Sequence, residues 1–386
     1  MKYLRFMKNM YIMFYKICFR AVYTFFCLVR KTDSNKMIIA LYRTDHLDDN
    51  LRLIYEEVRR QEPDIKIHLV QGVNKMNLKL FKEIIALADA RYLILDDYYL
   101  PVYLVKQRKS LKVIQLWHAA GALKKFGHST VGTKFGPSQS YINLVPVHSN
   151  YNFVYISAKK FVKYYAEAFY MDPNRIFALG IPRTDLLTDE KHTTKIRNNM
   201  YSTYPFLKNK DIVNILMAPT YRANGSYLES QLDVVKSIMH LSRLVGSNRR
   251  IIFKAHPYMD PSSVEKLKNC SNVFVAERQG INEWMLVADA FITDYSSSIF
   301  EFALLEKPMA HFVPDLAEYK NNRGFYAEME EMSDAAIIQD LPKLSAWINV
   351  RKTNEYFDSN RMIAYNFDHI DNVTARIVRH FLSTDK

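Results

Sequence analysis

Short apolar runs that alternate with helical segments restrict the fold of this chain more than any other feature. Ile251, Ile252 and Phe253, for example, form a compact run that turns polar at Lys254. Runs of this length and composition suit strands that are covered on both faces, as in a parallel sheet. Because such strands alternate with helices, we expect an α/β fold with doubly wound sheets. The predicted strands span residues 37–41, 65–70, 92–95, 112–117, 212–217, 251–253, 272–275, 290–294 and 311–313, with strand-and-turn segments at 151–157 and 176–185.

The chain length of 386 residues exceeds what one hydrophobic core usually supports, so we expect two domains. A polar stretch over 192–210 separates the two strand series. We therefore predict an N-terminal segment over 1–33 and two Rossmann-like domains over 34–195 and 196–386, which face each other across a cleft. The terminal helix, over 356–382, is a candidate to pack back on the first domain.

The charge balance favours a polyanionic partner. The formal net charge is +13, which suits nucleic acid, an anionic membrane surface or phosphorylated substrates, and does not choose among them. Cys18, Cys27 and Cys270 form an odd and sparse set without metal-ligand spacing. This argues for a reducing compartment and against a disulfide framework or a zinc site.

The first 31 residues mix aromatic and aliphatic side chains with scattered lysines and arginines. On a helical wheel, Lys16 and Arg20 share a narrow basic face with other polar residues, opposite a wide apolar face. This pattern is typical of a helix that lies in a membrane interface. Because charges interrupt the apolar run, we expect no transmembrane helix. A signal peptide and a helix packed on the protein's own surface are the alternatives.

Polar side chains follow several of the predicted strands. His118 follows one strand and His256 another, while Asp294 precedes three serines at a predicted helix start. Open α/β sheets bind ligands at the carboxyl ends of their strands, and a helix start with free N–H groups suits an anion. Each histidine could equally lie in an ordinary turn, and the serines could be ordinary helix caps. The serines are Ser296, Ser297 and Ser298.

Cationic side chains stand near the same strand ends. Lys124 and Lys125 follow the small residues after His118, and Arg183 lies in a turn after a short strand. Thr220 and Arg222 lie just past the strand that opens the second series. Lysine and arginine can hold phosphate, so these residues are candidates for phosphate or acceptor contacts.

Six motifs in this order carry a family resemblance: LWHAAGALKKFG, GIPRTD, LMAPTYR, FKAHP, ITDYSSSIFEFALLEKP and RGFY, across residues 116 to 326. The chain resembles the CDP-glycerol glycerophosphotransferases of bacterial teichoic acid synthesis. The resemblance implies a glycosyltransferase-B fold and an enzyme on the cytoplasmic face of the cell membrane. It also implies transfer of glycerol phosphate, or ribitol phosphate in related members, from a CDP-linked donor to an undecaprenyl-diphosphate-linked acceptor.

Residue by residue, the resemblance implies that His118 and His256 form the catalytic pair. It implies that Asp294, Ser296 and Ser297 serve the donor's phosphates, and that Thr220 with Arg222 contacts the donor. The domain over 34–195 would then be the acceptor side and that over 196–386 the donor side. Many members carry Gly where this chain has Ala119. This chain's Ala-Ala-Gly version resembles that of primase-like members.

The chemistry of the reaction fits these residue types. An acceptor hydroxyl must attack phosphorus with CMP as leaving group, so a base with a pKa near 7 is useful, and we expect His118 in that role. His256, Arg222 and the serines, Ser298 included, would stabilise charge on the phosphoryl oxygens. The sequence leaves open which histidine is the base. A divalent metal is conceivable as cofactor, although no carboxylate cluster marks a site for one.

Two other functions compete with this interpretation. A nucleotide-sugar glycosyltransferase would share the fold but move a sugar. A nucleic-acid-binding protein would suit the charge but needs a basic and aromatic platform, whereas the densest mixture of such residues is the N-terminal segment. We therefore expect a CDP-polyol donor, a lipid-linked acceptor and an anionic membrane surface as partners, with no nucleic acid. The N-terminal helix could also support an oligomer.

Overall fold

The protein's structure, a computed structural model, describes residues 2–42, 45–72, 75–133, 136–220, 233–256 and 258–383, without the side chains of residues 2, 4 and 5. The chain divides into two compact units. The first comprises Met1–Ala119, Phe126–Arg183 and Asp368–Lys386, and the second comprises Ala120–Lys125 and Thr184–Phe367. The sequence analysis placed the boundary at 195/196, but α8 (Glu190–Thr203) runs unbroken across that position. The boundary therefore lies earlier, between Arg183 and Thr184.

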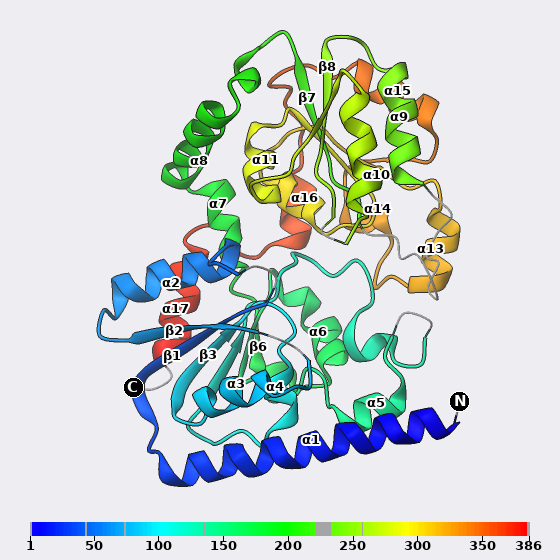
Figure 1. Ribbon diagram of the computed structural model, residues 1–386. Coiled ribbons are helices and arrows are strands. Elements are labelled where there is room, and N and C mark those ends of the chain that lie inside the picture. Colours follow the sequence, from blue (N-terminus) through cyan, green and yellow to red (C-terminus); the bar gives the residue numbers. More distant parts are fainter. Residues whose placement is uncertain are drawn as a thin grey trace. The chain divides into compact units, whose positions relative to one another are not determined.

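The first unit contains a parallel sheet in the order β2-β1-β3-β4-β5-β6 (Figure 1). Its order reverses between β1 and β3, so the carboxyl ends of these strands and of β4 form the edge where ligands bind in such sheets. The strands are β1 (Asp33–Leu41), β2 (Lys66–Gln71), β3 (Ala90–Leu95), β4 (Lys112–Gln115), β5 (Phe153–Tyr155) and β6 (Ile176–Phe177). The helices are α1 (Lys2–Val29), α2 (Asp49–Gln61), α3 (Lys79–Leu87), α4 (Leu100–Leu104), α5 (Gln139–Leu144), α6 (Val162–Phe169) and α17 (Val373–Ser383), with 3-10 turns at Gly127–Thr130, Lys159–Phe161, Pro173–Arg175 and Pro182–Thr184.

The second unit contains a parallel sheet in the order β12-β11-β10-β7-β8-β9, which is the Rossmann order read along the chain. The reversal falls between β7 and β10. The sequence analysis missed β12, which is short and only half-buried along most of its length. The strands are β7 (Val213–Met217), β8 (Arg249–Phe253), β9 (Val273–Val275), β10 (Ala290–Thr293), β11 (Met309–Phe312) and β12 (Ala336–Ile338). The helices are α7 (Asp185–Thr188), α8, α9 (Val234–Leu244), α10 (Pro261–Glu265), α11 (Ile281–Val287), α12 (Ser298–Ala303), α13 (Leu316–Arg323), α14 (Met329–Met332), α15 (Leu341–Asn349) and α16 (Asn360–Asn366), with 3-10 turns at Pro205–Lys208 and Lys266–Asn269.

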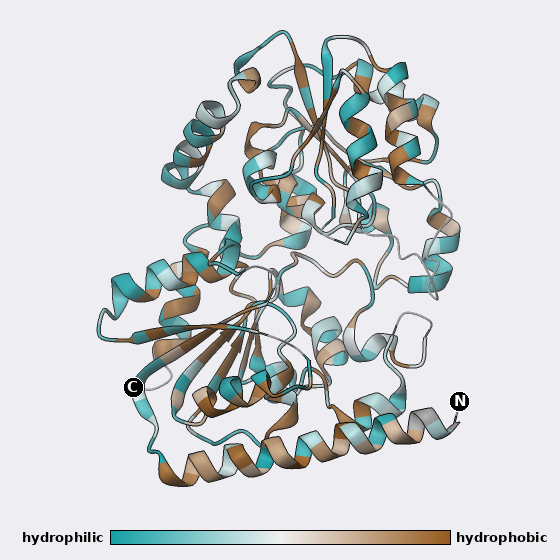
Figure 2. Ribbon diagram, viewed as in Figure 1, coloured by the Kyte–Doolittle hydropathy of each residue, from teal (hydrophilic) through white to brown (hydrophobic). Residues whose placement is uncertain are grey.

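Each sheet has its own hydrophobic core, visible as the brown central strands in Figure 2. In the first unit, α17 packs on the sheet, and its Ile377 and Phe381 are fully buried with Ile39 of β1. In the second unit, Ile238 of α9 and Leu344 of α15 are fully buried against the sheet. Full burial of one such side chain stabilises the fold by about 1.5–3 kcal/mol. The alternating pattern in the sequence therefore gives two separate α/β cores, as predicted.

The N-terminal segment forms one long helix, α1, that lies along α3, α4 and α5 of its own unit (Figure 1). Two of its basic residues bind the rest of the unit: Lys16 Nζ donates to the Leu144 carbonyl at 2.5 Å, and Arg20 Nε donates to the Leu104 carbonyl at 3.0 Å. These carbonyls lie at the carboxyl ends of α5 and α4, where cations are favourable. Ile12, Phe19 and Tyr23 pack into the unit, but many other apolar side chains of α1 are exposed. Among the described residues, its exposed large apolar side chains are Tyr3, Phe6, Met7, Met10, Tyr11, Met13, Phe14, Ile17, Phe25, Leu28 and Val29.

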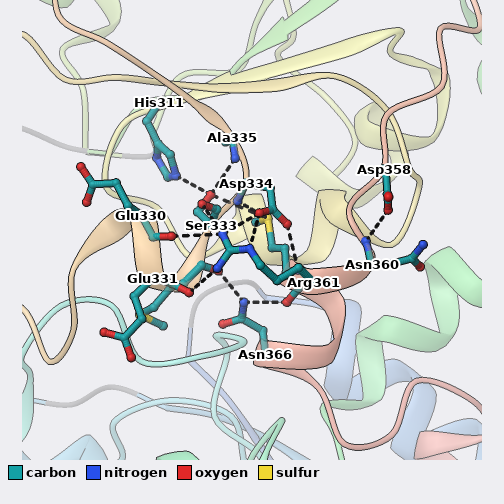
Figure 3. Close-up of polar contacts among 12 residues, drawn as sticks. His311, Glu330, Glu331, Ser333, Asp334, Ala335, Asp358, Asn360, Arg361 and Asn366 are labelled. Carbon is teal, nitrogen blue, oxygen red and sulfur yellow. Dashed lines mark hydrogen bonds and ion pairs between the residues drawn. The ribbon is translucent and has the colours of Figure 1, made fainter.

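A polar network in the second unit, buried at His311 and Ser333 and exposed at Arg361, joins β11 to the segment before β12 and to α16 (Figure 3). His311 is fully buried, and its Nδ1 donates to the Asp294 carbonyl at 2.6 Å. In the neutral ring Nε2 then accepts from the Ser333 hydroxyl at 3.0 Å. Arg361 holds the same segment by donating to the Asp334 carboxylate and to the Ser333 carbonyl. The network therefore holds the backbone carbonyl of Asp294 in place.

The pH dependence of stability follows from this network. Burial lowers the pKa of His311 to about 4, whereas an unfolded histidine titrates near pH 6.5. Between these values the unfolded chain binds a proton that the folded chain does not, so stability falls as the pH falls through this window. We expect the free energy of unfolding to fall by about 2 kcal/mol more in the native protein than in His311→Gln between pH 7 and pH 5.

Denaturant unfolding of both proteins at the two pH values measures this difference. His240→Gln, at an exposed position on α9, controls for the loss of a histidine. An equal pH dependence in the native protein and in His311→Gln would contradict the assignment.

Candidate active site

His118 follows a strained turn at the carboxyl end of β4. Trp117 adopts φ 55°, a left-handed conformation that costs a residue other than glycine on the order of 1–3 kcal/mol. Its N–H donates to Gln115 Oε1 at 2.9 Å, and its carbonyl accepts from Asn50 Nδ2 at 2.9 Å. Two buried amide side chains therefore hold the backbone of Trp117 on both sides of its Cα.

The position of the His118 ring fixes its neutral tautomer. His118 Nδ1 lies 3.0 Å from the carbonyl oxygen of Asp96, at the end of β3. Because a carbonyl only accepts, Nδ1 carries a proton and the lone pair of the neutral ring is on Nε2. The ring also stacks on Trp117, with 4.3 Å between ring centroids. His118 Nε2 is thus the nitrogen that can take up a proton.

An aromatic cluster supports Trp117 from behind. Phe126 stacks on the indole at 5.2 Å, and Phe169 meets it edge-on at 5.1 Å. His148 lies in the same cluster, 5.8 Å from the Trp117 ring, and its burial lowers its pKa to about 3. His148 is therefore neutral at physiological pH and serves packing here. The cluster restricts the indole on which His118 stacks.

In the second unit, Thr220 and Asp294 meet at the reversal point between β7 and β10. The Asp294 carboxylate accepts from Thr220 N and from Thr220 Oγ1, both at 2.9 Å, and from Tyr295 N at 2.6 Å. The carboxylate is buried and joins the two strand ends. An apolar pocket lined by Met217, Pro219, Val234, Ser237, Thr293, Asp294 and Phe312 adjoins it. Asp294 thus organises the turn, while Arg222 lies outside the described residues.

The serines follow directly. Ser297 occupies the N-cap position of α12 without a side-chain cap bond, and Ser296 Oγ lies 2.8 Å from Ser298 Oγ. Because α12 has only six residues, its dipole is small. The serine hydroxyl groups are therefore better candidates than the helix dipole to bind a phosphate here. Ser296 and Ser297 are half-buried, whereas Ser298 is buried. Hydroxyl donors are therefore available beside Asp294.

His256 follows β8 and has the opposite neutral tautomer from His118. Its Nδ1 accepts the backbone N–H of Tyr258 at 3.2 Å, so the proton of the neutral ring is on Nε2. The side chain is half-buried and lies 5.1 Å from the Tyr258 ring. His256 can therefore donate a hydrogen bond from Nε2 in its neutral form.

The lysine pair belongs to a segment that is built into the second unit. Lys124 forms an isolated antiparallel β-bridge with Phe325, and Lys125 N donates to the Gly324 carbonyl at 3.1 Å. The LWHAAGALKKFG motif therefore pairs with the RGFY motif. Upstream, Gly121 adopts φ 65°, and a Cβ there would lie 2.9 Å from the Phe300 ring. Only glycine fits this approach to α12. The small residues after His118 thus serve packing.

Arg183 lies beside the His118 turn in the first unit. Its N–H donates to Asn50 Oδ1 at 2.9 Å, and its guanidinium Nη1 lies 3.9 Å from Asp49 Oδ2. Asn50 therefore links the WHAAG and GIPRTD motifs. The sequence did not point to Asn50 or Gln115, because their partners are backbone groups of Trp117 and Arg183, and no local sequence pattern predicts these contacts.

The structure brings several of the candidate residues together in two groups. His118 and Arg183 meet around Asn50 in the first unit, whereas Thr220, Asp294 and the serines meet in the second. Within the described parts of the chain, no group of three or more His, Cys, Asp or Glu side chains could hold a metal ion.

Comparisons with known proteins agree with this architecture. The profile of the family described as CDP-Glycerol:Poly(glycerophosphate) glycerophosphotransferase matches residues 22–380. A teichoic acid ribitol-phosphate primase of Bacillus spizizenii is 35% identical over 379 residues, which cover 95% of each chain. A teichoic acid glycerol-phosphate primase of Bacillus subtilis is 26% identical over 75% of this chain and 73% of its own length.

The fold is shared with the wall teichoic acid polymerase TagF. A solved structure of TagF matches with a TM-score of 0.75 and 18% identity, over all of this chain and 96% of the other. This likeness confirms the glycosyltransferase-B type of fold. The chain belongs to the CDP-glycerol:poly(glycerophosphate) glycerophosphotransferase family.

Proposed function

We propose that this protein transfers a polyol phosphate from a CDP-linked donor to a lipid-linked acceptor in wall teichoic acid synthesis, with release of CMP. The observation that carries the proposal is the pair of strand-end histidines with opposite neutral tautomers. The family and the teichoic acid relatives support it.

The two tautomers suit the two halves of the reaction. His118 Nε2 takes the proton of the acceptor hydroxyl, whose oxygen attacks the phosphorus that bears the polyol. The bond from that phosphorus to the bridging oxygen breaks, and CMP leaves with the bond's electron pair. His256 Nε2 donates a hydrogen bond to the phosphoryl oxygens as charge develops on them. The geometry thus supports His118 as base and His256 as donor.

The remaining residues hold the donor. Ser296, Ser297 and Thr220 supply hydroxyl groups at the edge of the second sheet, where Rossmann folds bind nucleotides. Asp294 acts through Thr220, since its carboxylate already accepts three hydrogen bonds and would repel a phosphate. Ser298, Arg222, Lys124, Lys125 and Arg183 stay candidates for phosphate or acceptor contacts.

We propose ribitol phosphate, added in the priming step, as the group transferred. The sequence analysis placed glycerol phosphate first and ribitol phosphate second. The relatives favour the reverse order, because the ribitol-phosphate primase is 35% identical and the glycerol-phosphate primase 26%.

Release of CMP from purified protein tests the function and the donor together. With a lipid-linked disaccharide that carries glycerol phosphate as acceptor, we expect acceptor-dependent CMP release that is at least about tenfold faster with CDP-ribitol than with CDP-glycerol, a difference of about 1.4 kcal/mol. Addition of one unit per acceptor indicates priming. A preference for CDP-glycerol would overturn the ribitol assignment, and no CMP with either donor would overturn the function.

The two histidines have separable effects. His118→Ala removes the base, so we expect kcat to fall about 10²- to 10⁴-fold with little change in KM for the donor. His256→Ala removes a donor to the phosphoryl group, so kcat should fall about 10²-fold or more. Steady-state CMP release measures both, with the exposed His240→Ala as control. Near-native turnover in either variant would exclude that residue from the reaction.

We propose that α1 holds the protein on the cytoplasmic face of the cell membrane as a peripheral protein. Of the 18 large apolar side chains that are exposed among the described residues, 11 belong to α1. Soluble proteins rarely expose so many large apolar side chains on one helix, so this surface of α1 is a candidate for contact with an apolar partner. By length and composition, Phe6–Val29 would also suffice to cross a membrane. We favour a helix in the interface plane because Lys16 and Arg20 bind α1 to its own unit.

Substitutions on the apolar face test this arrangement. Phe14→Ser, Ile17→Ser and Phe25→Ser together should lower binding to phosphatidylglycerol vesicles more than tenfold, because each buried side chain contributes about 1.5–3 kcal/mol. CMP release with a soluble acceptor should not change. The matched control places serine at the exposed Leu78, Leu244 and Tyr356. Unchanged vesicle sedimentation of the α1 variant would contradict the proposal.

A further inference from the structure

The turn that carries His118 is held by side chains that no motif contains. The left-handed Trp117 exposes both its N–H and its carbonyl to side-chain partners instead of to a neighbouring strand. Such a backbone persists only where the surroundings over-determine it. The groups that bind this peptide therefore decide where the next residue, His118, points.

Asn50 binds the carbonyl side of the Trp117 peptide. It lies in the first turn of α2 and is fully buried. Its Nδ2 donates to the Trp117 carbonyl at 2.9 Å, while its Oδ1 accepts from Arg183 N at 2.9 Å. The amide nitrogen donates one hydrogen bond and the amide oxygen accepts another, so only one orientation of the amide satisfies both bonds. Asn50 thus ties the His118 turn to the Arg183 turn.

Gln115 binds the N–H of Trp117, which belongs to the preceding peptide group. It is the last residue of β4 and is fully buried. Its Oε1 accepts from Trp117 N at 2.9 Å, and its Nε2 donates to the Asp97 carbonyl at 3.0 Å. The neighbouring carbonyl, that of Asp96, accepts from His118 Nδ1 at 3.0 Å. The end of β3 therefore holds both the turn and the imidazole ring.

The backbone beyond His118 is held as well. Tyr165 OH donates to the Ala119 carbonyl at 3.3 Å. His118 thus stands between two backbone carbonyls that are held by side chains, those of Trp117 and Ala119, with its own Nδ1 bonded to the Asp96 carbonyl just past β3. Loss of the Asn50 bond would release the strained peptide on the side next to the catalytic ring.

We propose that Asn50 and Gln115 are positioning residues that hold His118 Nε2 toward the acceptor hydroxyl, an inference that rests on the proposed function. They act through the Trp117 peptide and do not touch substrate. A displacement of the base by about 1 Å can slow a reaction about 10²-fold, so small shifts of this turn matter.

Asn50→Asp tests the inference with a minimal change of shape. The carboxylate keeps an oxygen for Arg183 N but replaces the donor to the Trp117 carbonyl with an acceptor. The matched control is Asn152→Asp. Asn152 is also an amide beside β4, with Oδ1 accepting from Val113 N at 2.8 Å, but it lies near the strand's opposite end. Gln115→Met serves as a second variant if Asn50→Asp does not fold.

Two readouts separate positioning from general loss of structure. In CMP release assays we expect kcat of Asn50→Asp to fall at least about tenfold with KM for the CDP-polyol within about twofold, while Asn152→Asp keeps the native kcat. In parallel, ¹⁵N shifts of labelled histidine, with the His118 signal assigned by His118→Gln, report the tautomer of this ring. We expect the Nδ1–H tautomer in the native protein and a mixed population in Asn50→Asp.

The outcomes decide the inference. A native kcat in Asn50→Asp, or an equal fall of kcat in Asn50→Asp and in Asn152→Asp, would overturn it. An unchanged His118 tautomer and titration in Asn50→Asp would also overturn it. If even the native protein releases no CMP, the proposed function fails, and the ¹⁵N shifts alone still decide whether Asn50 holds the ring.

Discussion

Hydrogen bonds between the carboxyl ends of neighbouring parallel strands are the interaction on which both candidate sites depend. In the first unit Asn50 of α2 and Gln115 of β4 hold the backbone of Trp117, and Gln115 also binds the Asp97 carbonyl just past β3. In the second, the Asp294 carboxylate joins the ends of β7 and β10 by binding Thr220. A buried amide or carboxylate left without its partner costs about 1–3 kcal/mol or more, so each bond specifies one arrangement of its turn. The rigid sheets thereby determine where the reactive groups stand.

The two histidines show how backbone partners assign chemical roles. A carbonyl at Nδ1 leaves the lone pair of His118 on Nε2, whereas a backbone N–H at Nδ1 leaves the proton of His256 on Nε2. In the proposed reaction the same side chain would thus be a base in one place and a hydrogen-bond donor in the other. Deeper histidines behave differently, because burial keeps His148 and His311 neutral and confines them to support.

The sequence predicted the two parallel sheets because alternation between buried strands and amphipathic helices is a local property. It also predicted that His118, Thr220 and Asp294 follow strand ends. It did not reveal Asn50, whose hydrogen-bond partner is 67 residues away, nor the neutral tautomers of His118 and His256, since backbone contacts decide these. The charge pattern of α1 suggested basic residues turned toward lipid headgroups. The structure instead has Lys16 and Arg20 on the carboxyl ends of α5 and α4, because the domain surface offers carbonyls that no periodicity can show.

The most direct test of the account is a crystal structure of the protein with its CDP-polyol donor bound. The account predicts the diphosphate within hydrogen-bonding distance of the Thr220 and Ser296 hydroxyls and of His256 Nε2, with the Asp294 carboxylate still bound to Thr220. A donor whose diphosphate contacts none of these groups would contradict the account.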